Sequence, residues 1–307
     1  SVTPNSAATV QGINAIAADS STMNGVAAGQ SSGILGNDCG NAGPTGGCMS
    51  VSYGVNNIGT GNLQSGGTTI TTKVNDRVRV GIVLDQMLNT PSTETVKYNP
   101  SSPAIGTFIG WNNGKGLDIT ASAANASGQY TITRPTIANA ESGTGSPLVT
   151  SQAVQVKVAY TIPAMNDISV TPYAGLRYSN LNVGGYTETG AVYPLTMNPY
   201  SQNSTDAIAG VTVSKKLTDK LTASASVGVT KNLSSSPGSV TGTSDIVGTK
   251  TFDSQLPKGN DTSVGLGAGL SYEVAKGQHI NLNVGWHQKT LTTPDSTSVG
   301  ISYSFAF

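Results

Sequence analysis

Apolar residues alternate with small or polar residues along most of the chain, and the pattern is clearest at the C-terminus. There Val299, Ile301, Tyr303, Phe305 and Phe307 share one parity, while serine, glycine and alanine occupy the other. Successive side chains of a β-strand point to opposite faces, so a period of two predicts a strand with one apolar face.

The same alternation recurs in pairs of segments joined by very short connections. Each such pair predicts a β-hairpin. The short connections are residues 75–77, 112–116, 164–167, 217–220 and 275–278. With the C-terminal strand and a fainter first strand near residues 49–56, the pattern predicts twelve strands, an even number that suits a closed membrane barrel.

The connections between the hairpins are longer than those within them. They are residues 58–67, 87–103, 127–147, 184–205, 232–261 and the shorter 291–296. Outer-membrane barrels have short periplasmic turns and long outer loops. We therefore predict an all-β transmembrane barrel of twelve antiparallel strands over residues 46–307, with long loops extracellular and both barrel termini periplasmic.

Residues 7–35 lack this alternation and show a weak helical stripe. Val10, Ile13, Ala17 and Met23 fall roughly on one face, and Asp19 is the only charge. About 24 helical residues span roughly 36 Å, enough to run through a barrel lumen. We expect residues 1–45 to be a linker whose helix plugs the pore through Ile13, Asp19 and Met23. A disordered tail or a helix packed outside the barrel is the alternative.

The amino-acid composition indicates which environment the two faces of these strands meet. Only 10% of the 307 residues are charged, against about 25% in soluble domains, and 16 basic residues balance 16 acidic ones. Zero net charge argues against a nucleic-acid binder. A secreted β-sandwich would also alternate, but its polar face would carry lysine and glutamate. Here that face is glycine, serine, threonine and asparagine, as a narrow lumen requires.

Aromatic and charged residues also fit a barrel. Trp111, Tyr160, Tyr178, Tyr272 and Trp286 lie near predicted strand ends, as interfacial girdles do. The few charged or titratable residues with lumen parity are predicted to line the pore, and their basic members to hold the helix or its Asp19. They are Arg79, Asp85, Lys157, Arg177, Glu273 and His287.

Cys39 and Cys48 lie close together in a glycine-rich segment. They lack CxxC spacing and histidine partners for zinc, which favours a disulfide and an oxidising compartment over two free buried thiols. The chain begins at Ser1 without an initiator methionine or a leader, so we expect a processed piece of a longer precursor.

Candidate chemistry is sparse. His287 beside Asn283 allows an outer-membrane phospholipase to be considered, but no serine is marked as its nucleophile. Asn14 or Asn24 could cleave its own backbone if Glu273 or Asp85 assisted; simple pore-lining polar residues are the alternative. The sequence has no P-loop and no metal-ligand cluster. We predict neither an enzyme nor a cofactor.

Three segments resemble the C-terminal translocator (β) domain of classical monomeric autotransporters of type V secretion. The likeness is strongest in DISVTPYAGLRYSNLNVGGYTETG at residues 167–190. It extends to NDRVRVGIVLD at residues 75–85 and to the terminal strand ending in Phe307, covering roughly residues 68–307.

The resemblance implies a pore-forming anchor in the outer membrane of a Gram-negative bacterium, which helps to export its own N-terminal passenger. Tyr303, Phe305 and Phe307 then look like the signal for the β-barrel assembly machinery. The expected partners are outer-membrane lipid and lipopolysaccharide, that machinery, periplasmic chaperones and the passenger, with no nucleic acid and a monomeric barrel. A stand-alone channel or an adhesin acting through its long loops is the alternative.

Overall fold

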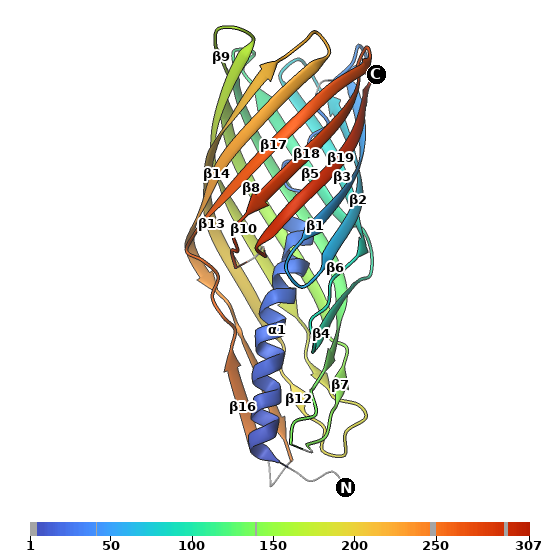
Figure 1. Ribbon diagram of the computed structural model, residues 1–307, viewed down its shortest axis with the longest axis vertical. Helices are drawn as coiled ribbons and strands as arrows, with labels where there is room; N and C mark the ends of the chain where they lie inside the picture. Colours follow the sequence, from blue (N-terminus) through green and yellow to red (C-terminus); the bar gives the residue numbers. More distant parts are fainter. Residues whose placement is uncertain (1–4, 41, 139, 246–249, 292–293) are drawn as a thin grey trace.

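A computed structural model gives the architecture, and it describes residues 5–40, 42–138, 140–245, 250–291 and 294–307. One helix, α1 (Ser6–Ser32), precedes a large β-barrel (Figure 1). The barrel strands are β1 (Gly47–Asn57), β2 (Asn62–Lys73), β3 (Val78–Asn89), β5 (Ala104–Asn112), β6 (Leu117–Thr133), β8 (Leu148–Tyr160), β10 (Ile168–Val183), β13 (Tyr200–Lys216), β14 (Leu221–Ser236), β17 (Thr262–Ala275), β18 (Gln278–His287) and β19 (Ser296–Ala306).

These strands pair antiparallel with their neighbours all the way round. β19 pairs with β1, from Cys48 opposite Ala306 to Asn57 opposite Thr297, and β10 pairs with β13. The second pairing closes the sheet, so the described residues form a closed barrel of twelve strands with one N-terminal helix, and the predicted fold is confirmed. The two-residue strand β9 (Ile162–Pro163) also pairs with β10.

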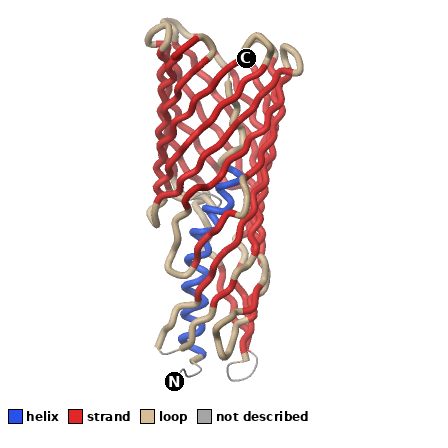
Figure 2. The backbone as a smooth tube through the Cα atoms, turned by 90° about the vertical axis from the view of Figure 1, so that its right-hand side faces the viewer, coloured by secondary structure: helices blue, strands red, loops and turns tan. Residues whose placement is uncertain are grey.

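The two ends of the barrel differ. One end, here called the hairpin end, has the five short turns and the C-terminus (Figures 1 and 2). At the other end β6, β8, β10, β13 and β14 continue past the rest of the barrel. Short strands join them there: β4 (Val96–Pro100), β7 (Thr144–Gly145), β11 (Tyr186–Thr187), β12 (Thr196–Met197), β15 (Ser239–Ser244) and β16 (Lys250–Gln255). We call this part the extension.

The extension corrects one expectation. Residues 87–103, 127–147, 184–205 and 232–261 are not simple long loops, because each contains strand residues of the extension. β4 pairs with β6, and β11, β12, β15 and β16 form a separate four-stranded sheet. The outer connections therefore build a walled continuation of the barrel.

Side-chain polarity along β10 reverses between the barrel and the extension. In the barrel the apolar side chains face outward, where Leu176 and Tyr178 are 55% and 45% exposed. In the extension they face inward, where Leu181 and Val183 are 1% and 2% exposed. The outward faces therefore meet lipid in the barrel and water in the extension.

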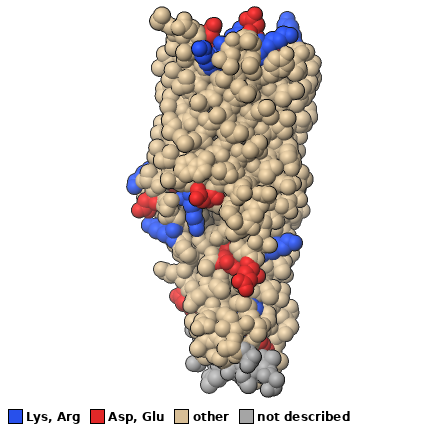
Figure 3. Space-filling view, viewed as in Figure 1, with Lys and Arg blue, Asp and Glu red and all other residues tan. Residues whose placement is uncertain are grey.

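The surface shows the same division. On the face in Figure 3, a band free of Lys, Arg, Asp and Glu separates charges at the hairpin end from charges near the start of the extension. Exposed Val156, Val158, Ile105, Ile109 and Leu282 are among the outward side chains of the barrel strands. We call this region the belt. Among the described residues, no helix has both the length and the apolar character needed to span a bilayer.

Helix α1 lies inside the extension, and its C-terminal end points into the barrel (Figures 1 and 2). Asn5 caps it, since the Asn5 Oδ1 accepts a hydrogen bond from the Ala8 amide at 3.0 Å. The helix ends at Gly33, whose amide donates to the Gly29 carbonyl oxygen at 2.8 Å. The described residues after the helix, 34–40 and 42–46, continue inside the barrel and lead to β1 at the hairpin end.

Candidate functional site

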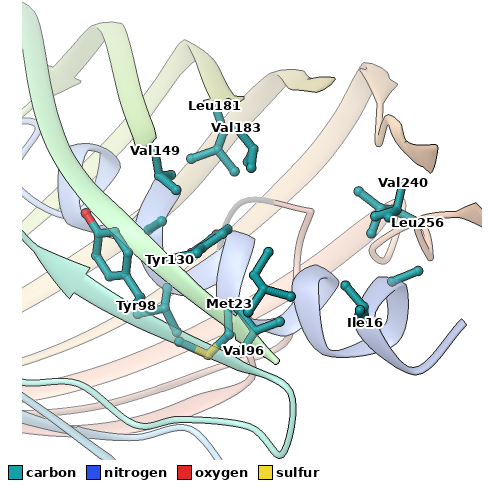
Figure 4. Close-up of a cluster of buried hydrophobic side chains, with 14 of the residues drawn as sticks. Ile16, Met23, Val96, Tyr98, Tyr130, Val149, Leu181, Val183, Val240 and Leu256 are labelled. Atoms are coloured by element: carbon teal, nitrogen blue, oxygen red, sulfur yellow. The ribbon is translucent and has the colours of Figure 1, made fainter. Parts of the chain in front are cut away.

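The candidate site is the interior of the barrel with its helix. The helix packs on an apolar core that the inward side chains of the extension provide (Figure 4). Ile13, Ile16 and Met23 are each at most 1% exposed, whereas Val10 is 39% exposed and lies off this face. The core residues around the helix are Val96, Tyr98, Tyr130, Val149, Leu181, Val183, Val240 and Leu256.

A polar network inside this core holds the middle of the helix. Asn24 is completely buried, and its Oδ1 accepts hydrogen bonds from the Tyr130 hydroxyl at 2.7 Å and the Tyr200 hydroxyl at 3.3 Å. The Asn24 Nδ2 donates to the Gln202 Oε1 at 3.4 Å. These bonds connect the helix to β6 and β13 and fix its register, because a helix that slid or rotated would leave the amide unpaired.

A further hydrogen bond holds the C-terminal end of the helix. The Tyr98 hydroxyl on β4 donates to the Gln30 Oε1 at 2.7 Å. Burial raises the pKa of the Tyr98 hydroxyl above its ordinary value, and burial next to the Glu188 charge does the same to the pKa of Tyr186 in the extension. The Tyr98 hydroxyl therefore stays protonated at neutral pH and donates to Gln30.

Asp19 is held by the extension and not by a lumen cation. Its Oδ2 accepts from the Thr95 amide at 2.9 Å and from the Thr95 hydroxyl at 2.7 Å. The expectation that Arg79, Lys157 or Arg177 would hold Asp19 is thus wrong. Two uncharged donors of Thr95 stabilise the carboxylate by hydrogen bonds.

A buried ion pair supports the outer half of the helix. Arg134 and Glu188 are each 1% exposed at the side chain and form two hydrogen bonds, Nε to Oε1 and Nη2 to Oε2, both 2.9 Å long. A Cβ atom added to Gly12 would lie 3.2 Å from the Arg134 Cγ, so the helix packs directly on the arginine stem.

Arg79 instead holds the segment that follows the helix. Its Nε donates to the Asp38 Oδ2 at 2.6 Å, and its Nη1 donates to the Asp118 Oδ2 at 2.6 Å. The Thr71 hydroxyl donates to the Asp38 Oδ1 at 3.1 Å. Residue 38 is thereby fixed against β2, β3 and β6. We call these contacts the Asp38 clamp.

Cys39 and Cys48 are joined by a disulfide next to this clamp. Both cysteines are buried, and Cys48 is the second residue of β1. The bond therefore links the lumen segment to the strand that closes the barrel against β19. The ionic and the covalent contacts together hold Asp38 and Cys39 against the wall formed by β1, β2 and β3.

The other predicted pore residues occupy separate places in the lumen. Arg177 Nη2 lies 3.6 Å from the Asp206 Oδ2 on the paired strand, and Lys157 Nζ lies 5.9 Å from the centre of the Tyr173 ring. The His287 Nε2 is hydrogen-bonded to the Ser296 Oγ at 3.0 Å. Asp85 lines the cavity beside the helix, whereas Glu273 accepts a bond from the Gly277 amide at the hairpin end.

The helix contacts the wall on the side of β6 and β8 and leaves open space on the other side of the lumen. A cavity of about 870 Å³ lies between its C-terminal half and the wall of β14, β17–β19 and β1, and a cavity of about 650 Å³ lies nearer the hairpin end. Asp38, Asn283 and Ser302 line both cavities. Serine and glycine are the commonest of their other lining residues, and Lys216, Asp219, Lys220 and Glu273 line the smaller cavity as well.

The geometry bears on the candidate chemistry. The hydrogen-bond partners of Asn24 in the described structure are Tyr130, Tyr200 and Gln202, and neither Asp85 nor Glu273 is among them. Asn14 lies on the exposed face of the helix. No group of three or more His, Cys, Asp and Glu side chains comes together within the described part of the chain.

Several residues that shape the site were not singled out from the sequence. They are Asn24 as a helix anchor, Asp38, Asp118, Arg134, Glu188 and Asp206. Asp118 and Asp206 have the same parity as the other inward-facing residues of β6 and β13, so the sequence pattern could have identified both. Arg134 and Glu188 gave none, since both fall in connections that lack alternation.

Comparisons with known proteins identify relatives that share this architecture. A model of the family described as Autotransporter beta-domain matches residues 51–285. The translocator domain of the autotransporter NalP from Neisseria meningitidis superposes with a TM-score of 0.64 at 17% identity, over 90% of this chain and 91% of that one. The beta domain of the Bordetella autotransporter BrkA gives 0.56 at 12% identity, over 87% and 100%. At these identities the superpositions show the fold alone.

A curated relative matches a shorter segment. Outer membrane protein A of Rickettsia rickettsii is 39% identical over 64 residues, which is 20% of this chain. The match spans about 3% of the length of that relative.

Proposed function

The chain belongs to the Autotransporter beta-domain family and is an outer-membrane translocator of a Gram-negative bacterium, and from this premise we propose that its barrel exports its own attached passenger to the cell surface. Helix α1 and residues 33–46 then remain in the interior as a plug. A long precursor reading frame upstream of Ser1 is expected. A signal peptide ending just before Ser1 would favour a stand-alone channel or adhesin instead.

The observation that supports plugging is the way the wall of the extension binds the helix. Most of α1 is buried, and both Asn24 and Gln30 are hydrogen-bonded to tyrosines of the surrounding wall. A polypeptide merely in transit needs no such dedicated partners. The proposed division of the chain follows: residues 1–45 are the linker with the plug, and residues 46–307 are the barrel.

Deleting residues 1–36 is expected to raise the single-channel conductance of the barrel severalfold in a planar bilayer. The plug fills one side of the lumen, and about 870 Å³ of open space already lies beside it, so its removal widens an existing passage. Tryptophan fluorescence of Trp111 and Trp286 on β5 and β18 checks that the barrel has folded. Equal conductance in both proteins would contradict the plug.

A point variant tests the same passage in the opposite direction. A Cβ atom at Gly29 would have no neighbour within 4 Å, and Gly29 lines the larger cavity. Gly29→Leu therefore extends into open space and is expected to lower the conductance of the full chain. Gly12→Leu is no substitute, because Gly12 packs on Arg134.

The orientation can be tested with two matched cysteine variants. Met165 in a hairpin-end turn is 82% exposed, and Val192 in the extension is 76% exposed. We expect a membrane-impermeant maleimide to label Val192→Cys on intact cells and Met165→Cys only after the outer membrane is opened. The reversed result would place the hairpin end outside the cell.

The remaining partners follow from the same proposal. Tyr303, Phe305 and Phe307 are exposed on the outward side of the terminal strand and would present the signal read by the β-barrel assembly machinery, after delivery by periplasmic chaperones. Phe307 exchanges two backbone hydrogen bonds with Gly47 of the closing seam, each 3.0 Å long. We further propose a monomeric barrel surrounded by outer-membrane lipid and lipopolysaccharide, without catalytic activity of its own.

A further inference from the structure

Four side-chain carboxamides stand in one register row on the outer face of the extension. Asn125 of β6 is opposite Gln152 of β8, Gln152 is opposite Asn180 of β10, and Asn180 is opposite Asn203 of β13. Their chain neighbours on the inner face are buried, so all four carboxamides point outward. We call these four residues the carboxamide row.

The carboxamide row borders the belt directly. One step along the same outward face towards the hairpin end lie Ala123, Val154, Tyr178 and Thr205, and Val154 and Tyr178 are 49% and 45% exposed. On β6, β8 and β10 the outward side chains thus change from Ala123, Val154 and Tyr178 to carboxamides within a single step, and on β13 the carboxamide follows Thr205. An outer-membrane barrel meets the boundary between lipid chains and headgroups where its apolar belt ends.

The row is uncharged, and its hydrogen-bonding groups are free to bind another molecule. Within the described part of the chain, no hydrogen bond is found for the side-chain amides of Asn125, Gln152, Asn180 or Asn203. Each amide offers two donors and one acceptor oxygen. The next row on the same face, one step farther from the hairpin end, is equally uncharged and consists of Ser127, Thr150, Asn182 and Ser201.

The dimensions of the row suit a headgroup layer. Neighbouring strands lie about 4.8 Å apart, and the strands of such barrels tilt by about 40°. A register row therefore climbs about 3 Å per strand, or roughly 9 Å over four strands. That rise covers the interfacial layer of a bilayer, which is about 5–7 Å thick on each side.

We propose that the carboxamide row, together with the ring of Tyr178, binds the sugar residues of the glycolipid that surrounds the barrel in the outer leaflet. Sugar hydroxyls need both donors and acceptors without net charge, and an exposed aromatic ring offers a flat apolar surface beside them. A phosphate partner would need cations, and the row and the next row outward carry none. The inference rests on the proposed function, because it places the extension outside the cell.

The test is a titration of the full chain, folded in detergent, with core oligosaccharide released from lipopolysaccharide by mild acid. We expect saturable binding. Changing Asn125, Gln152, Asn180 and Asn203 together to alanine should weaken it tenfold or more, since about 1.4 kcal/mol of lost hydrogen bonding has that effect. Asn260→Ala, which removes an exposed carboxamide away from the row, is the matched control and should bind like the parent.

Two further arms separate the alternatives. Inorganic phosphate is expected to bind equally weakly to the parent and to the fourfold variant; phosphate binding that depends on the row would overturn the proposal. Unchanged oligosaccharide binding in the fourfold variant, or none in the parent, would overturn it as well. Because the titration uses purified protein, its failure is distinct from a failure of export or of the orientation test with Val192→Cys.

Discussion

Replacing Glu188 with glutamine is expected to lower the free energy of unfolding of the extension by about 3–5 kcal/mol, the usual cost of breaking a buried ion pair. The Arg134 guanidinium is 1% exposed, and Glu188 supplies both of its hydrogen-bonded oxygens. The Glu188 Oε2 also accepts a bond from the Leu195 amide at 3.0 Å. Without the carboxylate, a buried cation loses its counter-charge beside Gly12 of the helix.

Two optical signals can separate the extension from the barrel in urea unfolding. Four of the eleven tyrosines, Tyr98, Tyr130, Tyr186 and Tyr200, pack in the extension core, so the part of the near-ultraviolet circular dichroism that is lost when they unpack reports on the extension. Both tryptophans of the chain lie on barrel strands, so their fluorescence reports on the barrel. We expect the tyrosine signal of Glu188→Gln to unfold at a lower urea concentration while the tryptophan signal changes little.

A double variant decides whether the buried charge is the cause. Arg134→Met combined with Glu188→Leu removes both charges and keeps apolar volume, and such replacements are often neutral or stabilising. It should recover most of the stability that Glu188→Gln loses. If the double variant is as unstable as the single one, packing of these side chains matters more than the ion pair.

The barrel was predictable because one physical rule governs every strand that crosses lipid. Wherever one face meets lipid and the other meets the lumen, a period of two in polarity follows, as in Val299, Ile301 and Tyr303 of β19. The short turns added the hairpin pairing. Residues 51–285 match the Autotransporter beta-domain model, in agreement with that interpretation.

The extension was missed because the apolar side chains of its strands face inward, whereas those of the barrel face outward. Along β10 the outward side chains turn from Leu176 and Tyr178 to Asn180 and Asn182, while the inward ones become apolar. A strand with a polar outer face and a few apolar inner residues has the composition of a loop rich in serine, threonine and asparagine. Only the three-dimensional pairing shows that β6 continues to Thr133.

Interior partners were less predictable than interior positions. Parity placed Arg79 in the lumen, but its partner Asp38 lies in a glycine-rich segment without alternation. The helix stripe marked Ile13 and Met23, yet the anchoring bonds come from Asn24 and Gln30, which are polar and fall outside that stripe. Such contacts depend on how a helix is rotated within its enclosure, and a weakly amphipathic sequence does not specify that rotation.

Removing the disulfide by changing Cys39 and Cys48 to alanine is expected to destabilise the folded chain by about 3 kcal/mol. The bond closes a loop of about ten residues, and the chain-entropy relation for that length gives about this value. A reductant that opens the bond should produce a similar loss in the parent protein and none in the double variant. Intact mass after alkylation without reduction should be unchanged in the parent; two added labels would mean that the bond is absent.

The same variant tests what the bond does for the plug. With the disulfide gone, the Asp38 clamp and the hydrogen bond from the amide of residue 39 to the Thr71 Oγ1, 3.5 Å long, still hold residues 38 and 39 to β2, β3 and β6. Adding Arg79→Met should then free the segment to move across the lumen, because its ionic and covalent attachments are both lost. We expect the current noise of the open channel to rise more in this combined variant than in the double cysteine variant alone or in Arg79→Met alone. Equal noise in all of them would mean that the burial of α1 is sufficient to hold the linker in place.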